Sequence, residues 1–248
     1  MKMDFDSGAK ALARLVCAGN VTVFSGAGLS TESGLLDFRS KNGIWAKADP
    51  TRLASVGALE RNYDEFLEFY KARLYVPDEI QPNIGHKIIA QWEKDGYVDG
   101  VITQNVDRLH QKAGSKKVWE LHGSLEPVLC HTCGRIGTEE DFLAGRPCKH
   151  CGGHLRPSVV LFGEMLPQEP LEMASSLSDS CKTFIVLGSS LVVSPANYFP
   201  RQAKAGGAKL AIINNDPTPL DYIADIVVNE GIGKFLSATD EIMRKGIV

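Results

Sequence analysis

Six short apolar runs, each about the length of a β-strand, alternate along the chain with segments of helical periodicity. The runs are VTVF, GVITQ, VVLF, TFIVLG, KLAIIN and IVV, at residues 21–24, 100–104, 159–162, 183–188, 209–214 and 226–228. Most are apolar on both faces, as in parallel sheets covered by helices on each side. Helical patterns lie at 7–19 (with Ser7 as the expected N-cap), 64–75, 84–95, 168–178, 196–205 and 234–245. The alternation predicts an α/β fold, a Rossmann-like doubly wound parallel sheet.

Two stretches interrupt this alternation. Residues 38–84 show no strand pattern and contain the helical segment LERNYDEFLEFYKARL, so we expect a helical insertion there. Residues 125–157 are rich in Cys, Gly and His, which predicts a small zinc-binding module. The Rossmann-like domain would then consist of residues 1–37, 85–124 and 158–248.

Composition narrows the class of ligand and the cellular location. Lys plus Arg number 27 and Asp plus Glu number 30, a formal net charge of −3, so the chain has no general basic field and nucleic acid is not expected as a direct ligand. The N-terminus has no long apolar run, so we expect neither a secretory signal nor a membrane span, and a cytoplasmic location.

Three polar or glycine-rich segments follow expected strands. Gly26-Ala27-Gly28, Gly188-Ser189-Ser190 and Asn214-Asn215-Asp216 would meet at the carboxyl edge of one sheet, where open α/β folds bind ligands. Glycine there lets backbone N–H groups approach a pyrophosphate, although Thr31 occupies the third glycine position of the dinucleotide fingerprint. Each segment alone is also compatible with a capped turn. Together they favour a nucleotide crevice.

Four of the six cysteines form two C-x-x-C pairs, Cys130/Cys133 and Cys148/Cys151, with fourteen residues between them. Such pairs close a tetrahedral thiolate site for Zn²⁺. Because four protein ligands leave no open position, the metal would be structural. Four reduced cysteines without a metal are the alternative.

Polar residues at two further positions suggest chemistry. Gln104-Asn105-Val106-Asp107 follows an expected strand, where the side chains either cap the next helix or bind a polar ligand. His122 follows the short apolar run VWEL and is a candidate general base, because its ordinary pKa is near neutrality. A structural role for this histidine is the alternative.

These motifs together resemble the sirtuin family of NAD-dependent protein deacylases. The matching segments are GAGLSTESGLLDFRS, TQNVDRLH, ELHG, the two C-x-x-C pairs, VVLFGEMLP, GSSLVVSP and IINND, in the family's order and over nearly the whole chain. The resemblance implies that NAD is consumed as a co-substrate, and that a loop over the cofactor replaces the usual Rossmann helix after the first glycine turn. It implies cofactor contacts from Gly26, Ala27, Gly28, Ser30, Phe38, Arg39, Gln104, Asn105, Val106, Asp107, Gly188, Ser189, Ser190, Asn214, Asn215 and Asp216.

The resemblance also implies a reaction. The amide oxygen of an acyl-lysine attacks the ribose carbon that bears nicotinamide, and His122 then acts as general base on a ribose hydroxyl. The products are free lysine, nicotinamide and O-acyl-ADP-ribose. The acyl-lysine protein or peptide would lie extended, by strand addition, against segments that contribute Val160, Phe162, Gly163 and Val193.

Tyr70 and Arg73 bear on the acyl group. They are three residues apart in LEFYKARL and share one face of a helix. The pair resembles the Tyr-x-x-Arg of sirtuins that remove acidic acyl groups, where it receives the distal carboxylate, as the planar guanidinium does well. Asp37 stands where that subgroup usually has Thr. Tyr and Arg as an ordinary surface pair, with plain deacetylation, are the alternative.

Two rival functions remain at this stage. One is mono-ADP-ribosyl transfer from the same activated cofactor to a different nucleophile. The other is a non-enzymatic, zinc-containing regulator that binds NAD or nucleic acid; His122 and the complete Gln-Asn-x-Asp segment disfavour it.

Overall fold

The computed structural model describes residues 2–41, 43–46, 49–74 and 80–246, and the chain groups into two compact units. The first unit contains Met1–Asp37, Gln81–Leu121 and Gln168–Val248, and the second contains Phe38–Ile80 and His122–Pro167. The expected helical insertion and zinc module therefore fall in one unit, except for residues 81–84. Residues 122–124 and 158–167, which the sequence analysis assigned to the Rossmann-like domain, group with them.

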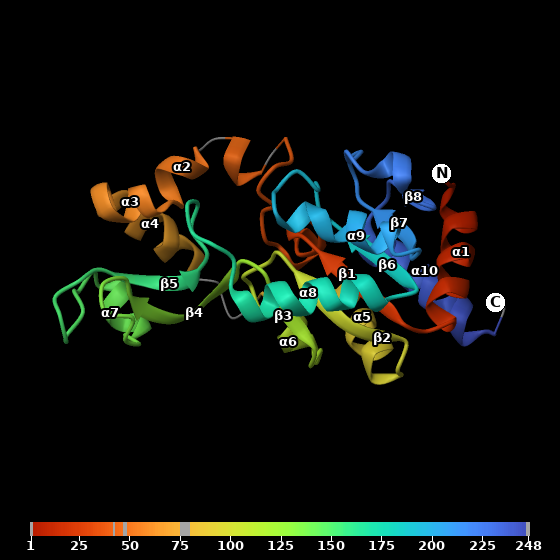
Figure 1. Ribbon diagram of the computed structural model, residues 1–248, viewed down its shortest axis with the longest axis horizontal. Coiled ribbons are helices and arrows are strands. Elements are labelled where there is room, and N and C mark those ends of the chain that lie inside the picture. Colours follow the sequence, from red (N-terminus) through yellow and green to blue (C-terminus); the bar gives the residue numbers. More distant parts are fainter. Residues whose placement is uncertain (1, 42, 47–48, 75–79, 247–248) are drawn as a thin grey trace. The chain divides into compact units, whose positions relative to one another are not determined.

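A parallel sheet of six strands forms the centre of the first unit, in the order β3-β2-β1-β6-β7-β8 (Figure 1). Its strands are β1 (Val21–Ser25), β2 (Val98–Thr103), β3 (Val118–Glu120), β6 (Thr183–Leu187), β7 (Lys209–Ile213) and β8 (Ile226–Val228). Strands β2 and β3 lie on one side of β1, and β6, β7 and β8 lie on its other side. The direction in which the chain adds strands therefore reverses between β1 and β6. Open α/β sheets bind ligands at such a switch point. The predicted Rossmann-like fold class is confirmed.

Helices cover both faces of this sheet (Figure 1). One face carries α1 (Phe5–Cys17), α5 (Ile84–Lys94) and α10 (Ile232–Arg244), and the other carries α8 (Gln168–Ser180) and α9 (Phe199–Ala205). In the core of the first face, Leu12, Trp92 and Phe235 are at most 1% exposed and pack against strand residues such as Val23 and Ile185. Each such side chain contributes roughly 1.5–3 kcal/mol by burial.

Two local expectations for the first unit are wrong. The N-cap of α1 is Asp4 rather than Ser7, because the Asp4 carboxylate accepts the N–H of Ser7 over 2.9 Å and so starts the helix earlier. Strand β3 was not among the expected strands. It is only three residues long, and its side chains are half-buried, so its apolar pattern is weak.

The second unit combines short helices with a separate hairpin-like sheet. Its elements are α2 (Pro50–Leu53), α3 (Val56–Arg61), α4 (Tyr63–Leu74), α7 (Glu139–Leu143) and the antiparallel pair β4 (Gly123–Cys130) and β5 (Leu155–Val159). The expectation that 159–162 is a strand of the parallel sheet is therefore wrong. Val159 ends β5, and Phe162 instead exchanges backbone hydrogen bonds with Ala54 and Val56 (2.9 and 3.2 Å).

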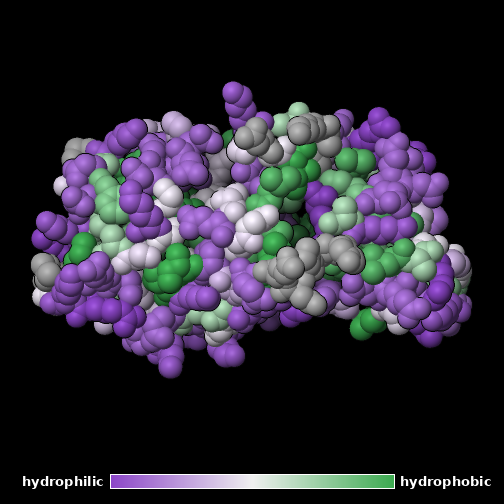
Figure 2. Space-filling model, turned by 180° about the vertical axis from the view of Figure 1, so that it is seen from behind, coloured by the Kyte–Doolittle hydropathy of each residue, from purple (hydrophilic) through white to green (hydrophobic). Residues whose placement is uncertain are grey.

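None of the helices in the described part of the chain combines the length and the apolar character needed to span a bilayer. The face drawn in Figure 2 is largely hydrophilic, and apolar atoms reach it in separate groups.

Candidate active site

The turns after β1 and β6 pack directly against each other at the switch point of the sheet. The N–H of Gly26 donates to Leu187 (3.0 Å) and that of Gly28 to the carbonyl of Gly188 (2.9 Å). A Cβ on Gly28 would stand 2.8 Å from Cα of Gly188, and one on Gly188, whose φ is +63°, would stand 2.3 Å from the nitrogen of Leu29. These glycines are thus required by backbone-to-backbone packing.

This packing changes the reason for the glycines. We expected the N–H groups of Gly26 and Gly28 to meet a pyrophosphate, but both are used inside the fold. Among the described residues, no acceptor receives the N–H of Ala27 or Ser189. These two donors lie on adjacent turns and are available to an anionic ligand at this edge.

The segment after the first turn is irregular, as the family resemblance implied. It contains two short 3-10 turns, η1 (Ala27–Leu29) and η2 (Thr31–Ser33). Two residues that the sequence analysis missed secure it. The amide nitrogen of Asn83 donates to the Leu29 carbonyl (2.7 Å), and the carboxylate of Glu32 accepts the N–H of Gly233 at the start of α10 (3.0 Å). Asn83 had a detectable signal, since Asn is a favoured N-cap and caps α5 here.

Three polar side chains meet beside this loop. The Asn105 amide donates to the Gly26 carbonyl (3.2 Å) and to the hydroxyl of Ser30 (3.1 Å), and Ser30 in turn donates to Asp107 (2.7 Å). Asp107 also accepts the N–H of Leu109 (2.9 Å), the first residue of α6 (Leu109–Ala113). Burial raises the pKa of Asp107, and these hydrogen bonds oppose the rise. The structure thus brings together Ser30, Asn105 and Asp107.

Other predicted cofactor residues of the first unit lie at the same strand ends. Ser189 donates to the Gln104 side chain (2.7 Å), which joins the ends of β6 and β2, whereas Val106 and Ser190 are half-buried. Asn214 follows β7 and donates to the Asp216 carbonyl (2.7 Å), while the side chains of Asn215 and Asp216 are exposed. Residues 214–216 therefore form a turn of their own at the edge of the sheet.

His122 and the expected acyl-lysine segment lie next to each other in the second unit. The N–H of Val160 donates to the His122 carbonyl over 2.8 Å, and the His122 side chain is half-buried. Gly123 has φ +69°, and a Cβ there would meet the Ser158 carbonyl at 2.2 Å, so only glycine allows this approach. Beyond Val160, Phe162 is 41% exposed, and Gly163 adopts φ +100°. Val193, the remaining residue expected to bind peptide, is half-buried in the first unit.

Tyr70 and Arg73 share a face of α4, as expected. Tyr70 is 5% exposed, and burial raises the pKa of its hydroxyl well above the ordinary value. The guanidinium of Arg73 lies 3.6 Å from the ring centroid of Phe69 and 5.8 Å from that of Phe38, and it donates to the Phe69 carbonyl (3.1 Å). Burial lowers the pKa of Arg73 to about 10. Among the described residues, no carboxylate pairs with Arg73.

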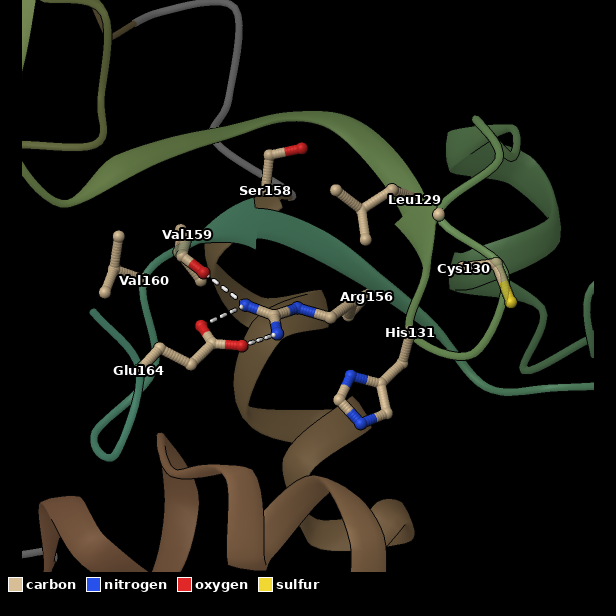
Figure 3. A pocket seen from close by; sticks show the side chains of 9 residues that line it. Leu129, Cys130, His131, Arg156, Ser158, Val159, Val160 and Glu164 are labelled. Carbon is tan, nitrogen blue, oxygen red and sulfur yellow. Dashed lines mark hydrogen bonds and ion pairs between the residues drawn. The ribbon is translucent and has the colours of Figure 1, made fainter. Parts of the chain in front are cut away.

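A pocket of about 360 Å³ lies between β4, β5 and the segment that follows β5 (Figure 3). Figure 3 shows the Arg156 guanidinium held between the Glu164 carboxylate and the Val159 carbonyl. The two ion-pair contacts with Glu164 measure 2.5 and 2.9 Å, and Glu164 also accepts the N–H of Leu161 (2.7 Å). The charges are thus paired internally and fix the bend at residues 160–164.

The four cysteines of the two C-x-x-C pairs converge at one point of the second unit. Their sulfur atoms all lie within 4.8 Å of one another, with 3.5 Å between Cys130 and Cys151 and 3.8 Å between Cys133 and Cys148. A tetrahedral Zn²⁺ with Zn–S bonds of about 2.3 Å needs sulfurs about 3.8 Å apart, so the four thiols fit the ion. They would fill its coordination sphere, which confirms the prediction of one structural zinc.

Comparison with known proteins places this arrangement in a family. The sequence model of the Sir2 family matches residues 26–195. An NAD-dependent protein deacetylase from Oceanobacillus iheyensis is 49% identical over 216 residues, 86% of this chain and 92% of the relative. NAD-dependent protein deacylase 2 from Archaeoglobus fulgidus is 42% identical over 246 residues, 95% and 96% of the two chains. A solved Sir2 structure with deacetylated p53 peptide and 3′-O-acetyl ADP-ribose has a TM-score of 0.89 and 38% identity, covering 96% of this chain and 98% of that one. The chain therefore belongs to the Sir2 family, the sirtuins.

Proposed function

We propose that this protein removes acetyl groups, and also acidic acyl groups such as succinyl and malonyl, from lysine side chains of proteins. As a member of the Sir2 family, the chain is an NAD-dependent protein deacylase with a structural zinc. The main support for NAD binding is the hydrogen-bonded network of Ser30, Asn105 and Asp107 beside the Gly26–Gly28 turn. It presents oriented amide, hydroxyl and carboxylate groups at the switch point of the sheet.

Separate groups of residues would bind NAD, act as the general base and bind the peptide. The turns after β1 and β6 would bind the phosphates of NAD through backbone N–H groups, with Phe38 and Arg39 near the nicotinamide ribose. Asn105 and Asp107 would hold that ribose and the carboxamide, and the Asn214 turn would bind the adenosine ribose. His122 would accept the proton of a ribose hydroxyl, and the backbone around Val160 and Gly163, with Val193, would bind the peptide by strand addition.

Tyr70 and Arg73 favour the proposal that the enzyme also removes acidic acyl groups. Arg73 is half-buried, and among the described residues no carboxylate pairs with it. Removing an unpaired guanidinium from water is costly, and the lowered pKa of Arg73 reflects that cost. The distal carboxylate of a succinyl group would supply the missing charge, and the Tyr70 hydroxyl would donate a second hydrogen bond. The stacking of Arg73 on Phe69 supports the competing interpretation, in which the pair serves only packing.

A panel of peptides that differ only in the acyl group tests the proposal. Acetyl-, propionyl-, succinyl- and malonyl-lysine peptides are each incubated with enzyme and NAD, and free lysine peptide is quantified. We expect turnover of both acetyl and succinyl peptides. Turnover of acetyl peptide alone would contradict the acidic-acyl part, and turnover of none would contradict deacylation itself.

A further inference from the structure

Two buried histidines lie next to Ser25, the residue before the Gly26–Gly28 turn, or against each other, and they have no part in the chemistry proposed above. His86 in α5 is 0% exposed, and His110 in α6 is 1% exposed. Their ring centroids are 5.0 Å apart, at an interplanar angle of 69°. Within the described part of the chain, neither ring nitrogen of His86 and not Nδ1 of His110 has a hydrogen-bond partner. Such groups are costly to bury, so an apolar side chain would fill this space better.

The one ring nitrogen that does have a partner begins a hydrogen-bonded chain. Nε2 of His110 lies 2.8 Å from the Ser25 hydroxyl, and Ser25 donates to the Thr103 hydroxyl over 2.8 Å. Thr103 then accepts the backbone N–H of Asn105 over 3.0 Å. Nε2 of His110 is therefore one end of a series of hydrogen bonds that reaches the Asn105 N–H through the Ser25 and Thr103 hydroxyls.

The environment keeps this histidine in one protonation state. Burial, and next the neighbouring His86, lower the pKa of His110 to about 3. Burial lowers the pKa of His86 to about 4. Both rings are therefore neutral at neutral pH, and Nε2 of His110 has the Ser25 hydroxyl as its hydrogen-bond partner.

This series of hydrogen bonds connects two of the strand ends at the candidate cofactor site, those of β1 and β2. Ser25 is the last residue of β1 and precedes Gly26, and Thr103 is the last residue of β2 and precedes Gln104. A hydrogen bond between the two hydroxyls fixes these strand ends relative to each other. The N–H of Asn105 is the next donor, so its backbone position depends on the same chain.

We propose that His110 is a positioning residue of the cofactor site, whose hydrogen bond at Nε2 fixes the backbone of Asn105 through Ser25 and Thr103. The proposal rests on the proposed function, because it assumes that Asn105 contacts NAD. It assigns His110 no contact with substrate and no proton transfer.

Substitutions of His110 separate the hydrogen bond from the space that the ring fills. His110→Leu fills much of the space but cannot form a hydrogen bond, whereas His110→Gln keeps an amide, which can donate or accept, about as far from the backbone as Nε2. We expect His110→Leu to weaken NAD binding, as both Kd by calorimetry and KM, about threefold to thirtyfold, the effect of losing about one buried hydrogen bond. The KM for acyl peptide should stay within about twofold of wild type, and His110→Gln should restore most of the NAD affinity.

Thr103→Val tests the same series of hydrogen bonds and leaves the histidine unchanged. It therefore still tests the proposal if His110→Leu does not fold. It removes the acceptor of the Asn105 N–H and should weaken NAD binding by a similar factor. Thr22→Val is the matched control. The Thr22 hydroxyl lies on the same sheet but donates to the Leu177 carbonyl (3.3 Å), so it takes no part in the hydrogen bonds that link His110 to Asn105. The Kd of this variant for NAD should equal that of the wild type.

Three outcomes would overturn the proposal: wild-type NAD affinity in folded His110→Leu, equal damage by Gln and Leu, or wild-type NAD affinity in Thr103→Val. Deacylation by the wild-type enzyme is measured in parallel. Its absence would contradict the proposed function, whereas wild-type deacylation with unaltered variants would contradict only the role of His110.

Discussion

The hydroxyl of Ser30 donates to Oδ2 of Asp107 over 2.7 Å and thereby joins two loops that are 77 residues apart in the sequence. The Asn105 amide donates to the same hydroxyl over 3.1 Å. Ser30 is thus the shared partner of the two side chains proposed to hold the nicotinamide half of NAD, and it is 2% exposed.

Ser30→Ala removes both hydrogen bonds at once. It leaves the half-buried Asp107 carboxylate and the buried Asn105 amide each with one partner fewer, so we expect the KM for NAD to rise by about tenfold. Ser237→Ala is the control, because that hydroxyl bonds to Gly233 within its own helix. Steady-state kinetics with NAD varied at saturating peptide would measure both. Equal KM values in the two variants would contradict the role of Ser30.

The two buried histidines predict how stability depends on pH. Their folded pKa values of about 4 (His86) and about 3 (His110) lie below the ordinary value, about 6.5. The unfolded chain therefore binds protons first, and the stabilisation present above pH 6.5 is lost as the pH falls towards 4. Between pH 7 and pH 5 we expect a loss of about 2 kcal/mol per histidine.

Urea unfolding of wild type and His86→Leu at pH 7 and pH 5 measures this loss. Release of zinc in acid affects both proteins, so the difference between them isolates the histidine. The variant should lose about 2 kcal/mol less than the wild type on acidification. An identical pH dependence would show that His86 titrates normally in the folded protein.

Cys130→Ser removes one ligand of the closed tetrahedral site. Because binding of a structural zinc is coupled to folding, we expect loss of the metal and a lower Tm. Cys17→Ser, an exposed cysteine outside the cluster, should keep one zinc per chain and the wild-type Tm. Atomic absorption and thermal unfolding give the two values, and a zinc-free wild-type protein under reducing conditions would refute the assignment.

Arg73→Met separates the acidic-acyl role from packing, because Met retains apolar volume and removes the charge. If Arg73 binds the distal carboxylate, kcat/KM for a succinyl peptide should fall by roughly one to two decades, since charged hydrogen bonds contribute about 1.5–3 kcal/mol. Acetyl-lysine has no carboxylate, so kcat/KM for the acetyl peptide should fall much less. Arg52→Met, which breaks an exposed pair with Glu65, should change neither activity. Equal losses for both peptides would mean that Arg73 serves packing.

The parallel sheet could be predicted because its central strands are buried on both faces and therefore read as continuous apolar runs. The same rule misplaced the run at 159–162. Apolar composition does not reveal which sheet a segment joins, and here Val159 pairs with Gly123 in the two-stranded sheet. The zinc cluster was predictable because the spacing within each C-x-x-C pair determines the local geometry.

The hydrogen-bonded network of the cofactor side was only partly predictable. Sequence placed Asn105 and Asp107 at the end of a strand, but not their link to Ser30, which depends on how two distant loops fold together. His110 gave no signal of its own, since a histidine inside a short helix has no typical partner. The use of the Gly26 and Gly28 N–H groups inside the fold likewise depends on the neighbouring turn after β6.

We propose that His122, acting with NAD, transfers an acyl group from lysine to ADP-ribose. Mass spectrometry of the products from an acetyl-lysine peptide and NAD tests it most directly, with wild type and His122→Ala compared. We predict equal amounts of deacetylated peptide, nicotinamide and O-acetyl-ADP-ribose from the wild type, and a rate roughly 10²–10⁴-fold lower from the variant, as for loss of a general base. ADP-ribose attached to protein without deacetylated peptide, or an undiminished rate in His122→Ala, would contradict the account.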